Sequence, residues 1–218
     1  ADIEEGRKML NWRERMVCPN CGCNSRQRYI IGKIFEYYEP GMRFLLYERN
    51  SNVFRVVSRE IPDVEGFEYA GEAYAENVYN EIVCKDVCCL NYTDESFELL
   101  VSNDVFQHVH DYRTAFQEAY RILKPDGKLI FTVPFNGNSS ETEVRAKVGE
   151  KGVVYIQDRW CSPNPIAGLE PLPVYQIFGW DILETLKASG FKDAYGKIYY
   201  GLKDGYMGYL PMYFEACK

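Results

Sequence analysis

The sequence predicts a doubly wound α/β fold, in which a mostly parallel sheet of seven strands carries helices on both faces. Short apolar runs that are typical of buried strands recur along the chain, and stretches with apolar residues at helical spacing alternate with them. The connections between most of these segments are short and rich in turn-forming residues. Strands that alternate with helices across short loops favour a parallel sheet over a barrel or a helical bundle. With 218 residues the chain is long enough for one sizeable domain.

Seven segments read as strands and four as helices. The expected strands are 42–48, 66–74, 80–87, 96–103, 128–135, 193–200 and 208–217, and the expected helices are 25–38, 50–60, 111–123 and 180–191. Asn50 or Ser51 is the expected N-cap of the second helix, and Asp181 that of the fourth, because short polar side chains accept the free amides of a helix start. Gly190 is the expected end of the fourth helix.

The pattern divides the chain into an N-terminal part, 1–40, and a main domain, 41–218. Residues 1–16 are charged without an apolar stripe, so we expect a loose arm before a Cys-rich turn and a covering helix. Within the main domain, residues 136–176 show no periodicity and contain four prolines from Pro163 to Pro173. Long irregular insertions in compact domains are commonly functional lids, which is the role we expect for this one.

Composition narrows the possible partners. The formal net charge is −7 and no basic stripe is visible, so we expect no nucleic-acid partner. No apolar run approaches 18 residues, so we expect no membrane span and a soluble, cytoplasmic protein. The eight cysteines show no regular spacing, and we expect them to be reduced thiols. A homodimer is an arrangement that the sequence allows.

Carboxylates follow several of the expected strands. In an open α/β sheet, ligands bind outside the carboxyl ends of the strands, so residues just after each strand end are the candidates for a site. An acid at the end of the second strand can accept both hydroxyl groups of a ribose. An acid after the third strand can accept an adenine amino group while the next apolar side chain packs on the ring. The pattern therefore favours a ligand with an adenosine part.

The run DESFELLVSNDVFQHVHDYRTAFQEAYRILKPDGKLIFTVPF (94–135) resembles the fourth-strand to fifth-strand segment of class I S-adenosylmethionine-dependent methyltransferases, in particular the type 11-like members that act on small molecules. In that family an acidic turn, an apolar strand and a His-containing stretch precede an R-L-K-P-G-G turn and a strand. The upstream segment CKDVCCLNYTDESFEL resembles the family's acid-bearing loop. The resemblance covers 82–135 closely, and covers 42–81 and 178–217 by order of elements.

The resemblance implies a Rossmann-like sheet, S-adenosylmethionine as cofactor, and a role for individual residues. It assigns Glu72 to the ribose with Glu68 as the competing choice, Asp86 and Val87 to the adenine, and Asn103 and Asp104 to the methionine part. His108 would lie about one helical turn beyond Asp104. These residues can also have plain structural roles, Glu72 as a solvated acid and His108 as a packed side chain.

The sequence departs from the family pattern at the turn after the first strand. A usual member has glycines there, which let backbone amides approach the cofactor, but this turn reads YERNSN, and Gly41 and Gly66 are the nearest glycines. Either the pocket has lost the cofactor or other groups hold it. Superfamily members that begin with a C-P-x-C-G…R-x-R segment, here CPNCGCNSRQR, are also poor in glycine at this turn. We expect Glu48 to bind the cofactor's ammonium group, and Arg26 or Arg28 its carboxylate.

The segment CPNCGC is half of a zinc site by spacing, because tetrahedral zinc requires four ligands. Cys18, Cys21 and Cys23 could supply three, but no second Cys pair or His pair follows closely. We predict no metal and a tight turn whose thiols pack under the following helix. A zinc site on these three cysteines is the alternative.

These features predict an enzyme that transfers a methyl group to a hydroxyl or amine of a small molecule, such as a sugar-linked or natural-product compound. His108 is the predicted general base, with Asp104 or His110 as alternatives, since histidine titrates near neutral pH. The fourth strand ends in Ser-Asn-Asp-Val, not in the Asn/Asp-Pro-Pro-Tyr/Phe of enzymes that methylate nucleobase amino groups.

Two other classes remain as rivals. A non-catalytic relative would keep the fold and lose the cofactor, and the glycine-free turn is the observation in its favour. A cleft filled by Tyr47, Arg49 or Phe106 would support that reading. A nicotinamide-dependent oxidoreductase would need a glycine-rich first turn, which is absent.

Overall fold

A six-stranded sheet forms the centre of the molecule. The computed structural model describes residues 2–4, 7–9 and 11–218. The strand order is β15 (Asp193–Ile198), β16 (Met212–Cys217), β8 (Leu123–Thr132), β7 (Phe97–Asn103), β3 (Phe44–Leu46) and β4 (Glu65–Gly66). The four strands from β8 to β4 are parallel, and β16 pairs antiparallel with both β8 and β15. The predicted mostly parallel α/β fold is confirmed.

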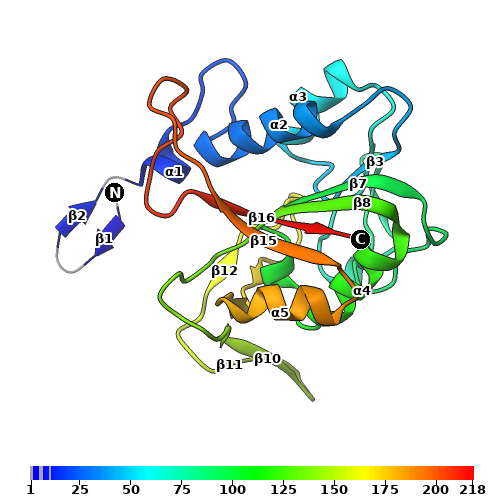
Figure 1. Ribbon diagram of the computed structural model, residues 1–218. Coiled ribbons are helices and arrows are strands. Elements are labelled where there is room, and N and C mark those ends of the chain that lie inside the picture. The colour runs from blue at the N-terminus through cyan, green and yellow to red at the C-terminus, as the bar shows by residue number, and fades with distance from the viewer. Residues whose placement is uncertain (1, 5–6, 10) are drawn as a thin grey trace.

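Helices cover both faces of this sheet (Figure 1). α2 (Ser25–Tyr37) and α3 (Asn52–Glu60) lie on one face, and α4 (Tyr112–Ile122) and α5 (Asp181–Ala188) on the other. Two cores form, one on each face of the sheet, as the residues at β3 show. Phe44 and Leu46 lie in the core beneath α2 and α3, and Leu45 and Tyr47 lie in the core beneath α4 and α5. Side chains alternate across a strand, and each buried apolar side chain contributes about 2 kcal/mol.

The expected strands 66–74 and 80–87 are largely absent from the sheet. Gly71, at φ +104°, turns the chain, and the next residues form a short 3-10 helix, η1 (Glu72–Tyr74). Beyond it, β5 (Val78–Tyr79) and β6 (Ile82–Val83) pair only with each other. A single parallel backbone bridge between Glu68 and Cys84 is found where the expected strand 80–87 would pair with the sheet. The central sheet therefore has six strands, one fewer than predicted.

Polar caps fix the helix starts. Asn24 and Gln27 form a capping box at α2, and Ser51 rather than Asn50 caps α3 by accepting the Phe54 amide at 3.0 Å. The predicted cap Asp181 is wrong. Trp180 occupies that position without a side-chain bond, and the Asp181 carboxylate instead accepts the Thr142 hydroxyl at 2.6 Å. Gly190, at φ +111°, ends α5 as expected.

The N-terminal part is more ordered than an arm. β1 (Asp2–Glu4) pairs with β2 (Arg7–Met9), and α1 (Trp12–Arg15) contacts α2. The Glu14 carboxylate accepts hydrogen bonds from the Asn24 amide at 2.6 Å and from Arg26 Nε at 3.0 Å. The expectation of a loose arm is therefore wrong for 12–15, and residues 1, 5, 6 and 10 lie outside the described residues.

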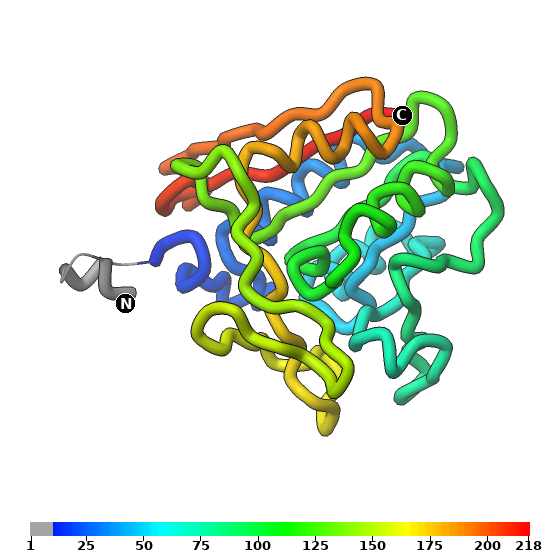
Figure 2. The backbone as a smooth tube through the Cα atoms, turned by 90° about the horizontal axis from the view of Figure 1, so that it is seen from below, coloured from blue at the N-terminus to red at the C-terminus, as the bar shows by residue number. Residues whose placement is uncertain are grey.

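The 136–176 segment is built from short antiparallel pairs. They are β9 (Glu143–Val144) with β14 (Gln176–Ile177), β10 (Ala146–Gly149) with β11 (Gly152–Tyr155), and β12 (Cys161–Ser162) with β13 (Leu172–Pro173). The β10–β11 hairpin projects from the body of the molecule (Figure 1). Seen from below, the segment lies between α1 and the chain around residues 70–95 (Figure 2). Among the helices described, none has the length and apolar character needed to cross a membrane.

Close packing of α3 on β4 explains a glycine and yields a prediction. A Cβ at Gly66 would lie 2.5 Å from the Phe54 ring, whereas a Cβ at Gly32 on α2 would meet nothing within 4 Å. We expect Gly66→Ala to lower the free energy of unfolding by about 1–3 kcal/mol through overpacking. Gly32→Ala should raise it by about 0.5–1 kcal/mol through helix propensity. Urea denaturation of both variants checks this, and equal effects would contradict the packing of α3 on β4.

Candidate active site

A pocket of about 470 Å³ opens at the carboxyl ends of β3, β4 and β7, within the size range of small-molecule sites. Three parts of the chain line it: α1, the ends of β3, β4, β7 and β8 with the loops that follow them, and the segment between β11 and β14. The lining residues are Arg13, Glu14, Glu48, Asn50, Ser51, Glu68, Tyr69, Asn103, Asp104, Val105, Gln107, His108, Pro134, Trp160, Ser162, Pro163, Pro165, Leu172 and Val174. This is the edge at which open α/β sheets bind ligands.

Glu48 lies two residues beyond β3 and is buried in the wall of the pocket. Its carboxylate accepts a hydrogen bond from the Asn103 backbone amide at 2.7 Å and another from the Asn103 side chain. Burial raises the pKa of Glu48 to about 8, although the Asn103 hydrogen bonds oppose the shift. The structure thus brings the predicted residues Glu48 and Asn103 together.

Glu68 lies two residues beyond β4 and is also buried. It accepts the Asn50 backbone amide at 2.7 Å, and burial raises the pKa of Glu68 to about 8. A backbone bridge between Glu48 and Glu68 holds the two acids next to each other. Glu72, the acid first assigned to the ribose, does not line this pocket, and its carboxylate accepts His110 Nδ1–H at 2.5 Å. The acid in the pocket is therefore the competing choice, Glu68.

Asp104 follows β7 with a left-handed backbone, φ +53°. Aspartate tolerates this region better than most residues, and such strain is common at functional sites. Its carboxylate pairs with Arg26 Nη2 at 2.6 Å and accepts the Thr132 hydroxyl at 3.1 Å. Arg26, which is buried, also donates to Thr132 Oγ1 at 2.9 Å and to Glu14. Arg26 and Thr132 thus hold the Asp104 carboxylate in place at the pocket.

His108 belongs to the short helix η2 (Phe106–His108) and lines the pocket. Its Nδ1 lies 2.8 Å from the Pro173 carbonyl oxygen, so this nitrogen carries the proton and donates it. Nε2 then accepts from the Gln107 side-chain amide at 3.2 Å. Burial lowers the pKa of His108, which keeps the ring neutral and leaves Nε2 unprotonated. His110, the alternative base, lies outside this pocket.

Gln107 is a pocket residue that the sequence did not reveal. Its Nε2 also donates to the Asp104 carbonyl oxygen at 2.7 Å, which fixes the orientation of the amide. Its Oε1 is buried and has no donor among the residues that the structure describes. A buried acceptor without a donor is uncommon in proteins, and here it adjoins a pocket. Nothing in the residues around Gln107 signals this role in advance.

The structure assigns the cationic side of the pocket differently from the sequence. Arg28 does not line the pocket, because its guanidinium donates to the backbone oxygens of Asp204 at 2.6 Å and Gly205 at 3.3 Å. Arg13 of α1 lines the pocket instead, 3.5 Å from Glu14. Sequence reasoning missed Arg13 and Glu14 because their place depends on how α1 packs on α2.

The two predicted adenine contacts are not in the pocket. Val87 is fully buried in the core on the α4 side of the sheet, and Asp86 accepts the Cys88 backbone amide at 2.8 Å. The chain bends at Gly71 and again in the β5–β6 hairpin, so residues after Cys84 leave the edge of the sheet where the pocket lies.

The glycine-free turn leaves the pocket open. No residue from 47 to 51 has a positive φ, so the turn needs no glycine. Tyr47 and Phe106 point into the core, where their ring centroids lie 6.0 Å apart. The guanidinium of Arg49 lies 4.0 Å from the Phe54 ring centroid. None of these three side chains lines the pocket, so the cleft is not filled as a module without cofactor would require.

The charged groups that line the pocket suit S-adenosylmethionine. Glu14, Glu48, Glu68 and Asp104 are acids facing a ligand that carries an ammonium, a sulfonium and two ribose hydroxyl groups. Arg13 is a cation for its carboxylate. In contrast, no set of three or more His, Cys, Asp or Glu side chains in the described part of the chain is arranged to hold a metal ion, and this includes Cys18, Cys21 and Cys23.

Comparison with known proteins agrees with this geometry. Residues 51–131 match the family model described as a methyltransferase domain. This match and the fold support a class I S-adenosylmethionine-dependent methyltransferase, with S-adenosylmethionine as its cofactor.

Several individual proteins are similar to it. The malonyl-[acyl-carrier protein] O-methyltransferase of Halorhodospira halophila is 37% identical over 125 residues, which are 51% of this chain and 42% of that protein. The biotin biosynthesis bifunctional protein BioHC of Saccharophagus degradans is 34% identical over 79 residues, 34% of this chain and 14% of that protein. The chain thus spans less than half the length of the curated relatives it matches.

Among solved structures, the fold is similar to that of the 1,6-didemethyltoxoflavin-N1-methyltransferase of Burkholderia thailandensis, which was solved with its substrate and S-adenosylhomocysteine. The TM-score is 0.53 at 14% identity, and the match covers 88% of this chain and 78% of that one. At this identity the likeness concerns the fold alone.

The raised pKa values of Glu48 and Glu68 have a consequence for stability. The folded protein holds these protons up to about pH 8, whereas an unfolded carboxyl releases them near pH 4.5. The folded state therefore binds more protons between these values, and we expect the free energy of unfolding to fall as pH rises from about 5 to 8. Glu68→Gln, which mimics the protonated acid, should weaken this dependence, and the exposed Glu184→Gln should not. Urea denaturation across that range, without ligand, tests it, and an identical slope in Glu68→Gln would contradict the assignment.

Proposed function

We propose that the protein transfers a methyl group from S-adenosylmethionine to a hydroxyl or amine of a small molecule. The observation that carries the proposal is the pair of buried acids, Glu48 and Glu68, at neighbouring strand ends on one open pocket. Two acids in this position complement the hydroxyl and ammonium donors of an adenosine-amino acid ligand. The cofactor, when bound, supplies a methyl group on a positively charged sulfur.

In this proposal Glu68 accepts the ribose hydroxyls and Glu48 the ammonium group. Arg13 faces the carboxylate, a role first given to Arg26 or Arg28. Once Glu48 and Glu68 have released their protons, the four acids of the pocket give it a negative field that attracts a cation. The proposed roles of Glu72, Asp86 and Val87 would require the chain after Gly71 to approach the pocket.

The acceptor part of the pocket lies between Asp104, His108 and the 136–176 segment. For a hydroxyl acceptor, His108 Nε2 is the proposed base, because it is neutral and its Nδ1–H is held by Pro173. The amide of Gln107 must then yield its place on Nε2 to the acceptor. Asp104 is the alternative base and is already paired with Arg26. An amine acceptor that enters neutral needs less help with its proton.

The 136–176 segment is the proposed lid and acceptor selector. Trp160, Pro163, Pro165, Leu172 and Val174 give the pocket an apolar wall. Such a wall excludes water and orients an acceptor by shape.

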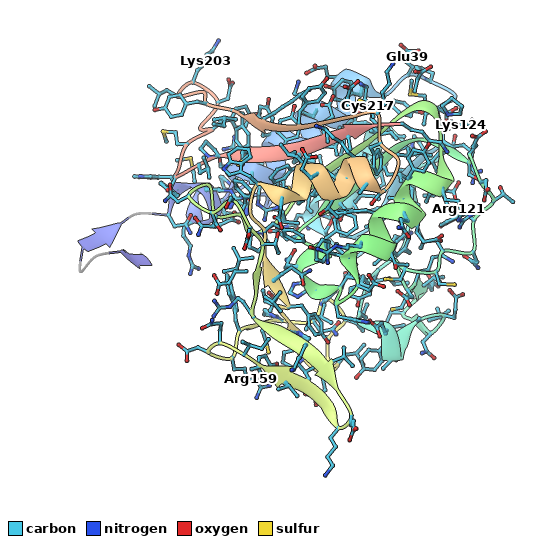
Figure 3. All side chains as sticks on the ribbon, turned by 60° about the horizontal axis from the view of Figure 1, so that its bottom comes forward. Glu39, Arg121, Lys124, Arg159, Lys203 and Cys217 are labelled. Carbon is cyan, nitrogen blue, oxygen red and sulfur yellow. The ribbon has the colours of Figure 1, made fainter. Side chains whose placement is uncertain are left out.

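Two side-chain hydrogen bonds tether this wall to the loops that follow β3 and β4. Asn50 donates to the Pro165 carbonyl oxygen at 2.5 Å, and Asn164 donates to the Ala70 carbonyl oxygen at 2.9 Å. On the outer side, Arg159 lies beside the β10–β11 hairpin (Figure 3).

The proposed class of methyl acceptor is supported by the activities for which similar proteins are named and by the charge of the chain. Relatives of the chain are named for methylation of a carrier-bound malonyl group and of glycine, sarcosine and dimethylglycine, which supports small-molecule or carrier-bound acceptors. A sugar or natural-product acceptor, a cytoplasmic location, the absence of a nucleic-acid partner and a homodimer stay part of the proposal. The net charge of −7 supports the exclusion of nucleic acid.

Titration calorimetry with S-adenosylhomocysteine tests the pocket and distinguishes its two candidate acids. We expect the parent to bind, and Glu68→Ala to weaken binding at least about tenfold, or about 1.4 kcal/mol, because the proposed hydrogen-bond partner of the ribose is lost. Glu72→Ala, which lies outside the pocket, should bind like the parent. No heat with the parent would favour the non-catalytic module, and a loss confined to Glu72→Ala would restore the first ribose assignment.

Cofactor affinity should depend on pH. A cationic ligand binds more tightly to ionised carboxylates, and the pKa values of Glu48 and Glu68 are both raised to about 8. We therefore expect the affinity for S-adenosylmethionine to increase from pH 6 to about pH 8.5 and to level off above it. Binding measured across this range, in the parent and in Glu48→Gln, checks the expectation, since the variant should show a smaller increase. A constant affinity would show that neither carboxylate faces the cation.

A further inference from the structure

The CPNCGC segment takes no part in the pocket, yet it presents two thiols at the ends of one turn. Residues 19–21 form the turn, with the Gly22 amide donating to the Cys18 carbonyl oxygen at 2.9 Å. The Cys18 amide donates to the Cys23 carbonyl oxygen, also at 2.9 Å. A bond from the fifth residue back to the first closes one helical turn, in which the Cα atoms of the first and fourth residues lie about 5 Å apart. Disulfides form at Cα separations of about 4.4–6.8 Å. Cys18 and Cys21 thus meet the distance requirement for a disulfide.

The three thiols of the segment have different surroundings. Cys18 is half-buried, and backbone N–H groups of Cys21 and Asn20 point at its sulfur, with the charge of Arg28 nearby. These hydrogen bonds lower the pKa of Cys18. Cys21 is also half-buried, but Cys23 is fully buried, and burial raises its pKa to about 12. Reactivity follows the thiolate, so Cys18 is the expected nucleophile and Cys23 is inert.

The turn is held rigidly by α3. Arg55 Nη2 donates to the Cys21 carbonyl oxygen at 2.7 Å, and Asn52 Nδ2 donates to the Gly22 carbonyl oxygen at 2.7 Å. Gly22 has φ +72°, a conformation that favours glycine. Because α3 fixes the backbone, the two sulfur atoms can join without a large rearrangement of the turn.

We propose that Cys18 and Cys21 form a redox-active dithiol that closes to a disulfide by exchange with a low-molecular-weight disulfide. The Cys18 thiolate attacks one sulfur of that disulfide and expels the other half as a thiolate. Cys21 then loses its proton and attacks the Cys18 sulfur, which releases the second half. Two protein thiols are oxidised and one small disulfide is reduced to two thiols, so atoms and electrons balance. The proposal does not depend on the methyl-transfer function.

Incubation of the reduced chain with oxidised glutathione, followed by alkylation and peptide mass mapping, tests the proposal. In the parent, we expect the peptide with Cys18 and Cys21 to lose two hydrogen atoms and to bind no glutathione. Cys21→Ser should trap glutathione on Cys18. Cys18→Ser should react with glutathione at position 21 at least tenfold more slowly than Cys21→Ser reacts at position 18. Cys89→Ser, which removes an exposed thiol elsewhere, should leave the Cys18–Cys21 disulfide unchanged.

Several results would overturn this assignment. They are a disulfide that involves Cys23, equal rates in the two variants, or glutathione that stays on Cys18 in the parent. Should a serine variant fail to fold, the order of iodoacetamide labelling in the parent gives the same decision. Cys18 must then react before Cys21 and Cys23, and any other order refutes the dithiol.

Discussion

The buried guanidinium of Arg26 is the contact on which the architecture of the pocket depends. It joins α2, which carries it, to Glu14 of α1, to Asp104 after β7 and to Thr132 of β8. A charge in this position is stable only while it is paired, and removal of one partner of such a pair typically costs about 3–5 kcal/mol. The same contact keeps α1 over the pocket and holds Asp104 in its left-handed conformation. α1 is therefore a wall of the site.

Opposite this wall, Glu48 and Glu68 stand next to each other without a cation between them in the described part of the protein. Water is largely excluded from both, so proton uptake is the least costly way to keep them buried. Asn103 partly offsets this cost at Glu48, and the Asn50 amide does so at Glu68. Together with Arg26, these contacts leave the pocket ready for a positively charged ligand: its acids are in place and its backbone is already fixed.

The sequence predicted well what local patterns determine. Apolar periodicity located α2, α3, α4 and the central strands, and the rule on strand ends located Glu48, Asn103 and Asp104. Prediction failed between 66 and 87, because Gly71 turns the chain and the β5–β6 hairpin pairs within itself, so Glu68 lines the pocket and Glu72 does not. Arg13 and Gln107 reach the pocket through tertiary packing of α1 and η2, for which no periodic signal exists.

The turn from Tyr47 to Ser51 has an entropic consequence. Glycine samples many more backbone conformations than other residues in an unfolded chain, so a glycine-rich turn loses more freedom when it is ordered. This turn contains none, and every residue in it has an ordinary backbone conformation. It also leads directly into the Ser51 cap of α3. This part of the pocket lining is therefore already ordered in the folded protein, and ligand binding requires little further ordering of the turn.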